Sequence, residues 1–156
     1  MTVRGNGNQG KAQSATTLLR ADHKLVSDLF ADYEKTGSRE KKRSIAQQIC
    51  AELTVHAQIE EEIFYPAVKG ALNDAELIPE ATVEHASLKV LIAELEAEKA
   101  DDEMFDAKVK VLSEYVKHHV KEEQNEIFPK ARHTDLDMNE LGARLAERKA
   151  ELMTAQ

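Results

Sequence analysis

Four segments of this sequence repeat apolar side chains at steps of three and four residues, the spacing of one face of an α-helix. Each apolar stripe is interrupted by a histidine, and in the second and fourth segments a glutamate follows four residues later. A carboxylate facing a protein interior costs several kcal/mol unless a partner compensates its charge. The pattern therefore predicts a helical bundle that holds metal ions in its core. The candidate ligands are His23, His56, Glu60, His85, His119 and Glu123.

The six candidates are expected at one level of such a bundle. His23 and His85 lie several residues after the starts of their segments, whereas His56 and His119 lie about ten residues before the ends of theirs. Because each helical residue adds about 1.5 Å of rise, these levels coincide when consecutive helices run antiparallel. The spacing of four residues places each glutamate beside its histidine on one helical face. Apart from the candidates, the only polar member of the four stripes is the amphipathic Tyr33.

Capping residues set the expected helix boundaries. We expect a first helix from Ala15 to Lys35 with Gly37 as a left-handed cap, and a second from Ser38 to Tyr65-Pro66 or one turn beyond. The later expectations are a loop over 71–79, a third helix from Pro79 to about Lys99, a fourth from Asp101 and Asp102 to Phe128-Pro129, and a last helix over 138–153, opened by Asp137 and Glu140 as a capping box.

These elements predict an all-α fold, an up-down-up-down antiparallel four-helix bundle, because short connections join consecutive helices. The expected organisation is a disordered tail over 1–13, the bundle over 14–132 and a C-terminal helix within 135–154. The chain also repeats itself: each histidine-glutamate motif begins ten residues before a proline, Pro66 or Pro129, which indicates pseudo-twofold symmetry. The C-terminal helix either packs on the bundle or serves a homodimer, so monomer and homodimer both stay open.

Composition excludes several other classes of protein. The net charge of −8 disfavours nucleic acid as a partner. No stretch approaches the roughly 20 apolar residues that span a bilayer, and the N-terminus lacks the apolar core of a secretory signal. The single cysteine, Cys50, permits no internal disulfide and fits a reducing compartment. We therefore expect a cytoplasmic protein that does not associate with a membrane.

The types of ligand narrow the expected metal. Neutral imidazole is a borderline nitrogen donor that suits iron, zinc and copper, and a carboxylate can bridge two cations with its two oxygens. Zinc prefers fewer ligands in a tetrahedral arrangement. Four imidazoles and two carboxylates leave open positions on a pair of six-coordinate ions, where oxygen, peroxide or hydroxide can bind. Iron is the preferred interpretation, and ligand type alone does not separate it from manganese or mixed occupancy.

The repeated motifs, their prolines and the two isolated histidines resemble the hemerythrin family, in its bacterial branch of cation-binding domains named for His-His-Glu. The resemblance covers about residues 15–130. It implies a four-helix bundle with two iron ions, oxo- or hydroxo-bridged, whose members bind O2, handle peroxide or NO, or sense iron. Carried over by position, the four histidines would be terminal ligands, and Glu60 and Glu123 would be bridging carboxylates.

This sequence departs from the oxygen-carrying members of that family. The positions four residues from His85 are Ala81 and Lys89, so the second histidine of the third helix is missing. The last carboxylate also follows His119 by four residues, unless His118 is the ligand, a spacing that differs from the carriers. One iron would then have fewer protein ligands, which favours reaction with peroxide or sensing over reversible oxygen transport.

Several residues beside the candidate ligands have simpler interpretations. His118 reads as a solvent-facing residue, and Glu61 or Glu122 could supply an extra ligand or support one. Phe64, Tyr65 and Phe128 are interpreted as packing at the bundle end, although Tyr65 could approach an open metal position.

Three classes of function are consistent with the sequence. The first is a di-iron protein that reacts with O2 or peroxide and has weak peroxide-decomposing activity. The second is a non-catalytic iron-binding or sensing module, and the third is a metal-free helical interaction protein.

Overall fold

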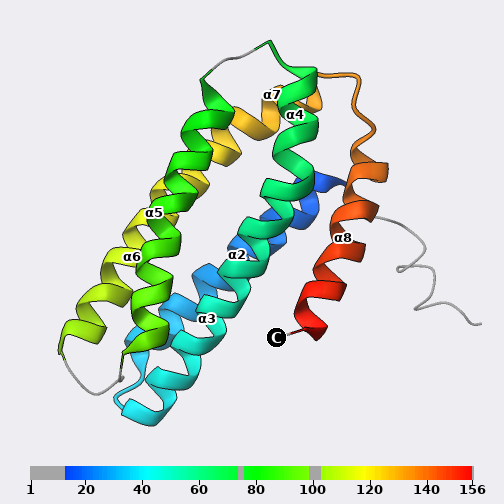
Figure 1. Cartoon of the computed structure of the whole chain (residues 1–156). Helices are drawn as coiled ribbons and strands as arrows, with labels where there is room; N and C mark the ends of the chain where they lie inside the picture. The colour runs from blue at the N-terminus through cyan, green and yellow to red at the C-terminus, as the bar shows by residue number, and fades with distance from the viewer. Residues whose placement is uncertain (1–12, 74–75, 99–102, 156) are drawn as a thin grey trace, which may run out of the picture.

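The computed structural model describes residues 13–73, 76–98 and 103–155, and the regular structure within them is helical (Figure 1). The long helices are α2 (Ala15–Lys35), α3 (Arg39–Ile59), α5 (Leu77–Ala97) and α6 (Glu103–Glu122). Helices α3 and α6 each continue through one π-helical turn into a short α-helix. These segments are η1 (Glu60–Phe64) with α4 (Tyr65–Ala71), and η2 (Glu123–Ile127) with α7 (Phe128–Arg132). The last helix is α8 (Met138–Thr154).

The four long helices form the predicted antiparallel bundle. Helix α2 packs against α3 and α5 packs against α6, while contacts of α3 with α5 and of α2 with α6 close the ring. Figure 1 shows the four helices side by side along one long axis, with α4 and α7 together at one end. The all-α up-down-up-down fold is thus confirmed. Within the described residues, no helix is long and apolar enough to cross a membrane.

Side-chain caps begin several helices where the sequence predicted them. The Ser38 hydroxyl accepts a hydrogen bond from the Lys41 amide at 3.2 Å, and Asp137 accepts from the amides of Asn139 and Glu140 at 3.0 Å. These oxygens satisfy amides that have no partner within the first helical turn. Ser14, which is not among the predicted caps, caps α2 in the same way, at 3.2 Å from the Thr17 amide.

Other boundaries differ from the predictions. Gly37 does not adopt the left-handed conformation, because α2 ends at Lys35 and the extended backbone of the next residue, Thr36, already turns the chain away. Helix α5 begins at Leu77, two residues before Pro79, since a proline is tolerated throughout a first turn that lacks amide partners. The predicted caps Asp101 and Asp102, and all of the predicted 1–13 tail except residue 13, lie outside the described residues.

Two apolar clusters fill the bundle, and the polar candidates lie between them. The first cluster occupies the half of the bundle that includes the α2–α3 connection, and its members include Val26, Phe30, Leu53, Leu88, Ile92 and Val116. The second occupies the half with α4, α7 and α8, and its members include Leu19, Ile59, Phe64, Ala81, Phe128 and Leu145. Each candidate histidine has neighbours in both clusters along its own helix. The polar layer is therefore sealed on two sides by packed side chains.

Helix α8 packs on the bundle of its own chain. It lies against α2, α3 and η1 (Figure 1). Leu141 and Leu145 are buried in the second cluster. At Gly142 the approach is so close that a Cβ atom would lie 1.8 Å from the backbone oxygen of Gln13. A glycine is therefore required where α8 crosses the start of α2.

Candidate metal centre

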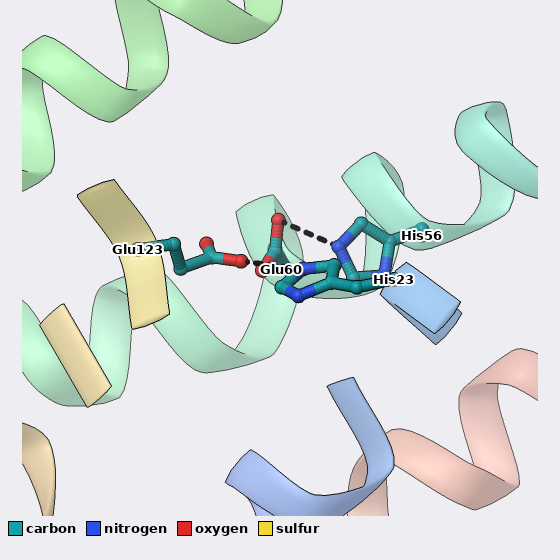
Figure 2. A group of neighbouring side chains, drawn as sticks. All are labelled: His23, His56, Glu60 and Glu123. Carbon is teal, nitrogen blue, oxygen red and sulfur yellow. Dashed lines mark ion pairs between the residues drawn. The ribbon is translucent and has the colours of Figure 1, made fainter. Parts of the chain in front are cut away.

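The six predicted ligands converge in the buried layer, none with more than 8% of its surface exposed. Their donor atoms form two groups, each within 4.8 Å, and Glu60 belongs to both. One group joins Glu60 to His85 and His119. The other contains His23, His56, Glu60 and Glu123, which Figure 2 shows pointing toward one another from three separate segments of the bundle. The antiparallel arrangement of the helices thus places the six side chains at one level of the bundle, as predicted.

Each carboxylate faces one imidazole from each half of the sequence repeat. Glu60 Oε1 lies 3.3 Å from His56 Nε2 and 3.1 Å from His85 Nε2. Glu123 lies 2.9 Å from His23 Nε2 and 3.7 Å from His119 Nε2. All four imidazoles therefore turn the same ring nitrogen, Nε2, into a common space. Four imidazole nitrogens and two carboxylates thus face one buried space, where they could hold a cation.

The other ring nitrogen of each histidine is held by an acceptor outside the layer. Because these acceptors are carboxylate or amide oxygens, Nδ1 carries the proton and donates it, which leaves the Nε2 lone pair for a cation. The pairs are His56 with Asp22 at 2.8 Å, His119 with Glu84 at 2.5 Å, His85 with Glu61 at 2.8 Å, and His23 with Gln124 at 2.8 Å.

These four acceptors follow the sequence repeat. Asp22 and Glu84 directly precede His23 and His85, and each supports the histidine of the neighbouring helix. Glu61 and Gln124 directly follow the two bridging candidates, Glu60 and Glu123. Glu61, expected as an extra ligand or as a supporting residue, contacts Nδ1 of His85. The adjacency of an acidic residue to each isolated histidine was visible in the sequence, but its partner across the bundle was not.

The π turns begin at the two glutamates, which regular helical periodicity did not predict. In each turn an amide donates to the carbonyl five residues back: Tyr65 to Glu60, and Phe128 to Glu123. Tyr65 and Phe128 therefore lie one turn beyond their glutamates and face the site. Such single π turns within α-helices occur frequently at functional sites. They also explain why Phe64 is fully buried while Ile63, the predicted stripe member, is only partly buried.

Tyr65 lies within the site instead of merely packing at the bundle end. Its hydroxyl donates a short hydrogen bond to Glu123 and lies 3.3 Å from Glu60 Oε1. The same oxygen is 3.3 Å from His85 Nε2 and 3.2 Å from His119 Nε2. Aligning the two repeats on their prolines pairs Tyr65 with Phe128. The hydroxyl of Tyr65, which its counterpart lacks, was the feature of the sequence that could have pointed to a role in the site.

In the other half of the site, Phe128 occupies the equivalent position. Its ring stacks on the His23 imidazole with 5.8 Å between centroids and an interplanar angle of 2°. Because a phenyl ring has no hydroxyl, it closes its side of the layer without adding a donor. The two halves are thus alike in their backbone and different in their chemistry.

Burial and charge act on this cluster in opposite directions. Burial lowers the pKa of His56, but the carboxylates of Glu60 and Asp22 outweigh it and raise that pKa well above its usual range. Burial dominates at His119 and lowers its pKa. Burial and the charge of Glu60 raise the pKa of Glu123. Protons therefore supply positive charge to the layer when no cation does, and a cation must displace them.

The donor atoms fit a cation better than they fit one another. Four buried atoms of the layer make no hydrogen bond: Nε2 of His23 and of His56, Oε2 of Glu60 and Oε1 of Glu123. Buried polar atoms without partners are costly, and metal coordination satisfies them. Imidazole nitrogen with carboxylate oxygen is a donor set suited to iron and its first-row neighbours. The layer is therefore a buried histidine-glutamate cluster suitable for metal binding.

His118 points away from this layer, as predicted. Its side chain is 67% exposed and lies 3.4 Å from Glu122 and 3.8 Å from Glu84. A hydrogen bond with Glu84 raises the pKa of Glu122. Glu122 thus belongs to an outer group and contacts none of the inward-facing nitrogens. Of the two adjacent histidines in α6, only His119 reaches the core.

The C-terminal helix contacts the support of the site. Lys149 Nζ lies 2.5 Å from Asp22 Oδ1, and the other oxygen of Asp22 holds His56. Burial would raise the pKa of Asp22, but the bonds to His56 and Lys149 outweigh burial and lower it. Asp22 is therefore a charged carboxylate with a donor on each oxygen.

An antiparallel four-helix bundle with a buried histidine-glutamate layer defines a class of helical cation-binding proteins. Residues 14–131 match the family described as the hemerythrin HHE cation binding domain, so this chain belongs to that family. The bundle is similar to the crystal structure of a hemerythrin HHE cation binding domain-containing protein from Mycobacterium kansasii, with a TM-score of 0.78 and 22% identity over 92% of this chain and 89% of that one. That likeness supports the fold.

A longer relative is also similar in sequence. The chain is 27% identical over 122 residues to a DNA nickase of Nostoc sp. (strain PCC 7120). The match covers 78% of this chain and 34% of the relative, so this chain spans about a third of that protein's length.

Proposed function

We propose that this chain is a non-haem di-iron protein that binds or reacts with O2, peroxide or NO, in the handling of oxidative or iron stress. In this proposal His23, His56, His85 and His119 are terminal ligands, and Glu60 and Glu123 are the bridging carboxylates. The observation that carries the proposal is the common direction of four Nε2 atoms toward two carboxylates, each of which faces an imidazole from both halves.

The protein's own residues would prepare this site in three ways. The Nδ1 acceptors fix the imidazole rings, so that little reorganisation is needed when a cation binds. The apolar clusters on two sides of the layer lower the local dielectric constant, which strengthens electrostatic interactions inside it. Burial and the two glutamates raise the pKa of Tyr65, so its hydroxyl keeps a proton to donate. Two iron ions, when bound, would supply two electrons to a small ligand.

The ligand count favours reaction over transport. The oxygen carriers that this chain resembles have a further histidine four residues from the one on the third helix. This chain has Ala81 and Lys89 at those positions. Fewer protein ligands leave a coordination position open to a small molecule. Weak peroxide-decomposing activity is the enzymatic form of this proposal. The bond between Lys149 and Asp22 favours iron sensing as the second candidate, because it links the position of a peripheral helix to the support of His56.

DNA nicking is the activity of a longer relative, and we do not extend it to this chain. The net charge of this chain is −8, whereas DNA binding relies on cationic side chains that neutralise phosphates. The proposed ligands are also buried, out of reach of a polymer backbone. A cytoplasmic location and a monomeric or homodimeric state remain predictions from the sequence.

Metal analysis and stopped-flow mixing test the proposal together. Protein purified without added metal is reconstituted with iron(II) under nitrogen, desalted, and assayed for metal content and for an oxo-bridged iron absorption after exposure to O2. We expect two irons per chain and a spectral change on mixing with hydrogen peroxide or NO. Two irons without any reaction would favour the sensing candidate. A chain that retains no transition metal after reconstitution would rule out both.

A further inference from the structure

An apolar cavity of about 200 Å³ lies beside the imidazole layer. Its floor is formed by the four site histidines, and its walls belong to the first apolar cluster. Glu60, Glu123 and Tyr65 do not line it. The aliphatic wall residues include Val26, Leu53, Leu88, Ile92 and Val116.

The cavity is much larger than the ligands considered so far. A water molecule occupies about 30 Å³ in the liquid, and O2, NO and hydrogen peroxide are of comparable size. An apolar protein cavity of roughly 150 Å³ is large enough to hold benzene. The space next to the imidazoles therefore matches a compact hydrocarbon group of about that size or slightly larger.

The polarity of the lining favours hydrocarbon over water. A buried water needs two to four polar partners, and the aliphatic walls provide none. The imidazole Nδ1 atoms are already committed to Asp22, Glu84, Glu61 and Gln124. Two lining histidines, His23 and His56, keep a buried Nε2 atom without a hydrogen-bond partner. A molecule with one polar head and an apolar body would match both surfaces.

The cavity opens between α3 and α5. Thr54 of α3, and Ala93 and Glu96 of α5, line it and are exposed. Lys89, whose side chain is 54% exposed, also lines it and pairs with Glu61, the acceptor that holds His85. The mouth thus carries two opposite charges, Lys89 and Glu96, and the remaining charged residue of the lining, Asp22, is bonded to His56 and Lys149.

We propose that this cavity binds the hydrocarbon part of an organic hydroperoxide, an aryl or branched-alkyl group, with its oxygen head toward the imidazole layer. The inference rests on the proposed function and names its substrate class. Reduction of such a hydroperoxide would break the O–O bond and give the alcohol and water. It would need two protons, which solvent would supply, and two electrons, which two iron(II) ions would supply on becoming iron(III). The alcohol is therefore a stable probe of the cavity.

Binding of 2-phenyl-2-propanol, the alcohol from cumene hydroperoxide, tests the proposal without any turnover. Calorimetric titration of the metal-free and the iron-loaded protein is compared with that of two alanine variants. Ala57→Leu, next to His56, fills the cavity, whereas Ala86→Leu, next to His85, adds the same bulk at an exposed position outside it. We expect binding to wild type and to Ala86→Leu, and at least about tenfold weaker binding to Ala57→Leu.

Peroxide kinetics distinguish this inference from the proposed function. With iron loaded, Ala57→Leu should react with hydrogen peroxide at the wild-type rate and with cumene hydroperoxide about tenfold more slowly. If Ala57→Leu loads less iron than wild type, Leu88→Phe fills the same cavity from α5. Equal alcohol binding by wild type and the filled variants, or none by wild type, overturns the cavity proposal even where hydrogen peroxide reacts. Alcohol binding to a protein that never loads iron would retain the cavity and remove its hydroperoxide chemistry.

Discussion

Lys149 and Asp22 form a 2.5 Å ion pair that joins the C-terminal helix to the metal layer. Asp22 is 5% exposed, and its second oxygen holds His56 Nδ1 at 2.8 Å. The family match ends at residue 131, so Lys149 lies outside the matched domain and still supports one of its proposed ligands. The helix that looked peripheral in the sequence therefore contributes to the proposed site.

Replacing Lys149 with methionine should weaken metal binding. The change removes the donor that fixes Asp22, and loss of such outer partners typically costs about 10–100-fold in metal affinity. Competition with a coloured chelator measures the affinity. Lys149→Arg should restore most of it, whereas Lys24→Met, which breaks an exposed pair on α2, should leave it unchanged. Equal affinities in Lys149→Met and wild type would mean that α8 only packs.

The two adjacent histidines of α6 provide an internal control for the ligand set. His119→Ala removes an inward Nε2 and should abolish loading of two metals, while His118→Ala removes an exposed side chain and should leave loading near normal. Metal content per chain after reconstitution and desalting measures both. Equal losses in the two variants would place the wrong histidine in the core.

Tyr65→Phe should slow the reaction with peroxide more than it affects folding. Phenylalanine already occupies the equivalent position, Phe128, so the packing tolerates the ring. The lost hydroxyl is the proton donor that contacts Glu123, and general acid groups contribute about 10²–10⁴-fold. We expect a thermal midpoint near wild type and a peroxide rate lowered by at least about tenfold. A wild-type rate would show that the hydroxyl is not used in the reaction.

The apolar stripes were sufficient to predict the bundle, because helical periodicity and short connections leave few ways to bury four faces. They also located all six inward side chains, since each interrupted a stripe at a matching depth. The π turns escaped prediction because one extra residue per turn leaves the local composition unchanged. Consequently Tyr65 was assigned mainly to packing, although it faces the site.

The outer acceptors could be recognised only in the folded chain. The sequence shows Asp22 and Glu84 as acidic residues directly before His23 and His85, but their partners His56 and His119 come from other helices. Pairing across a bundle depends on helix rotation, which a stripe defines only roughly. The contact of Lys149 with Asp22 depended in addition on where α8 docks, and the sequence left that open.

Gly142→Ala should destabilise the protein by about 1–3 kcal/mol, because the new methyl group would overlap the backbone at Gln13 and force α8 away from α2. Gly70→Ala is the matched control, since nothing lies within 4 Å of its Cβ position in α4. There, alanine should be neutral or stabilising by roughly 0.5–1 kcal/mol. Urea unfolding measures both changes. A neutral Gly142→Ala would mean that α8 shifts without cost.

Asp106→Asn should reveal a stabilising charge at the opposite end of the bundle. Hydrogen bonds from Arg39 at 2.9 and 2.6 Å and from Tyr33 at 2.7 Å lower the pKa of Asp106 from 3.8 to about 2. A carboxyl whose folded pKa is lowered stabilises the protein above its unfolded pKa and loses that contribution as pH falls through the folded value.

Because the Asp106 side chain is 30% exposed, solvent screening limits the expected contribution to about 1 kcal/mol. Wild type should therefore be more stable than Asp106→Asn by about that amount at pH 7, and the difference should shrink between about pH 4 and pH 2. Urea unfolding of the metal-free proteins across this range measures it, which keeps metal loss out of the comparison. A difference that stays constant down to pH 2 would assign the effect to packing, because the contribution would then not depend on the charge of the Asp106 carboxylate.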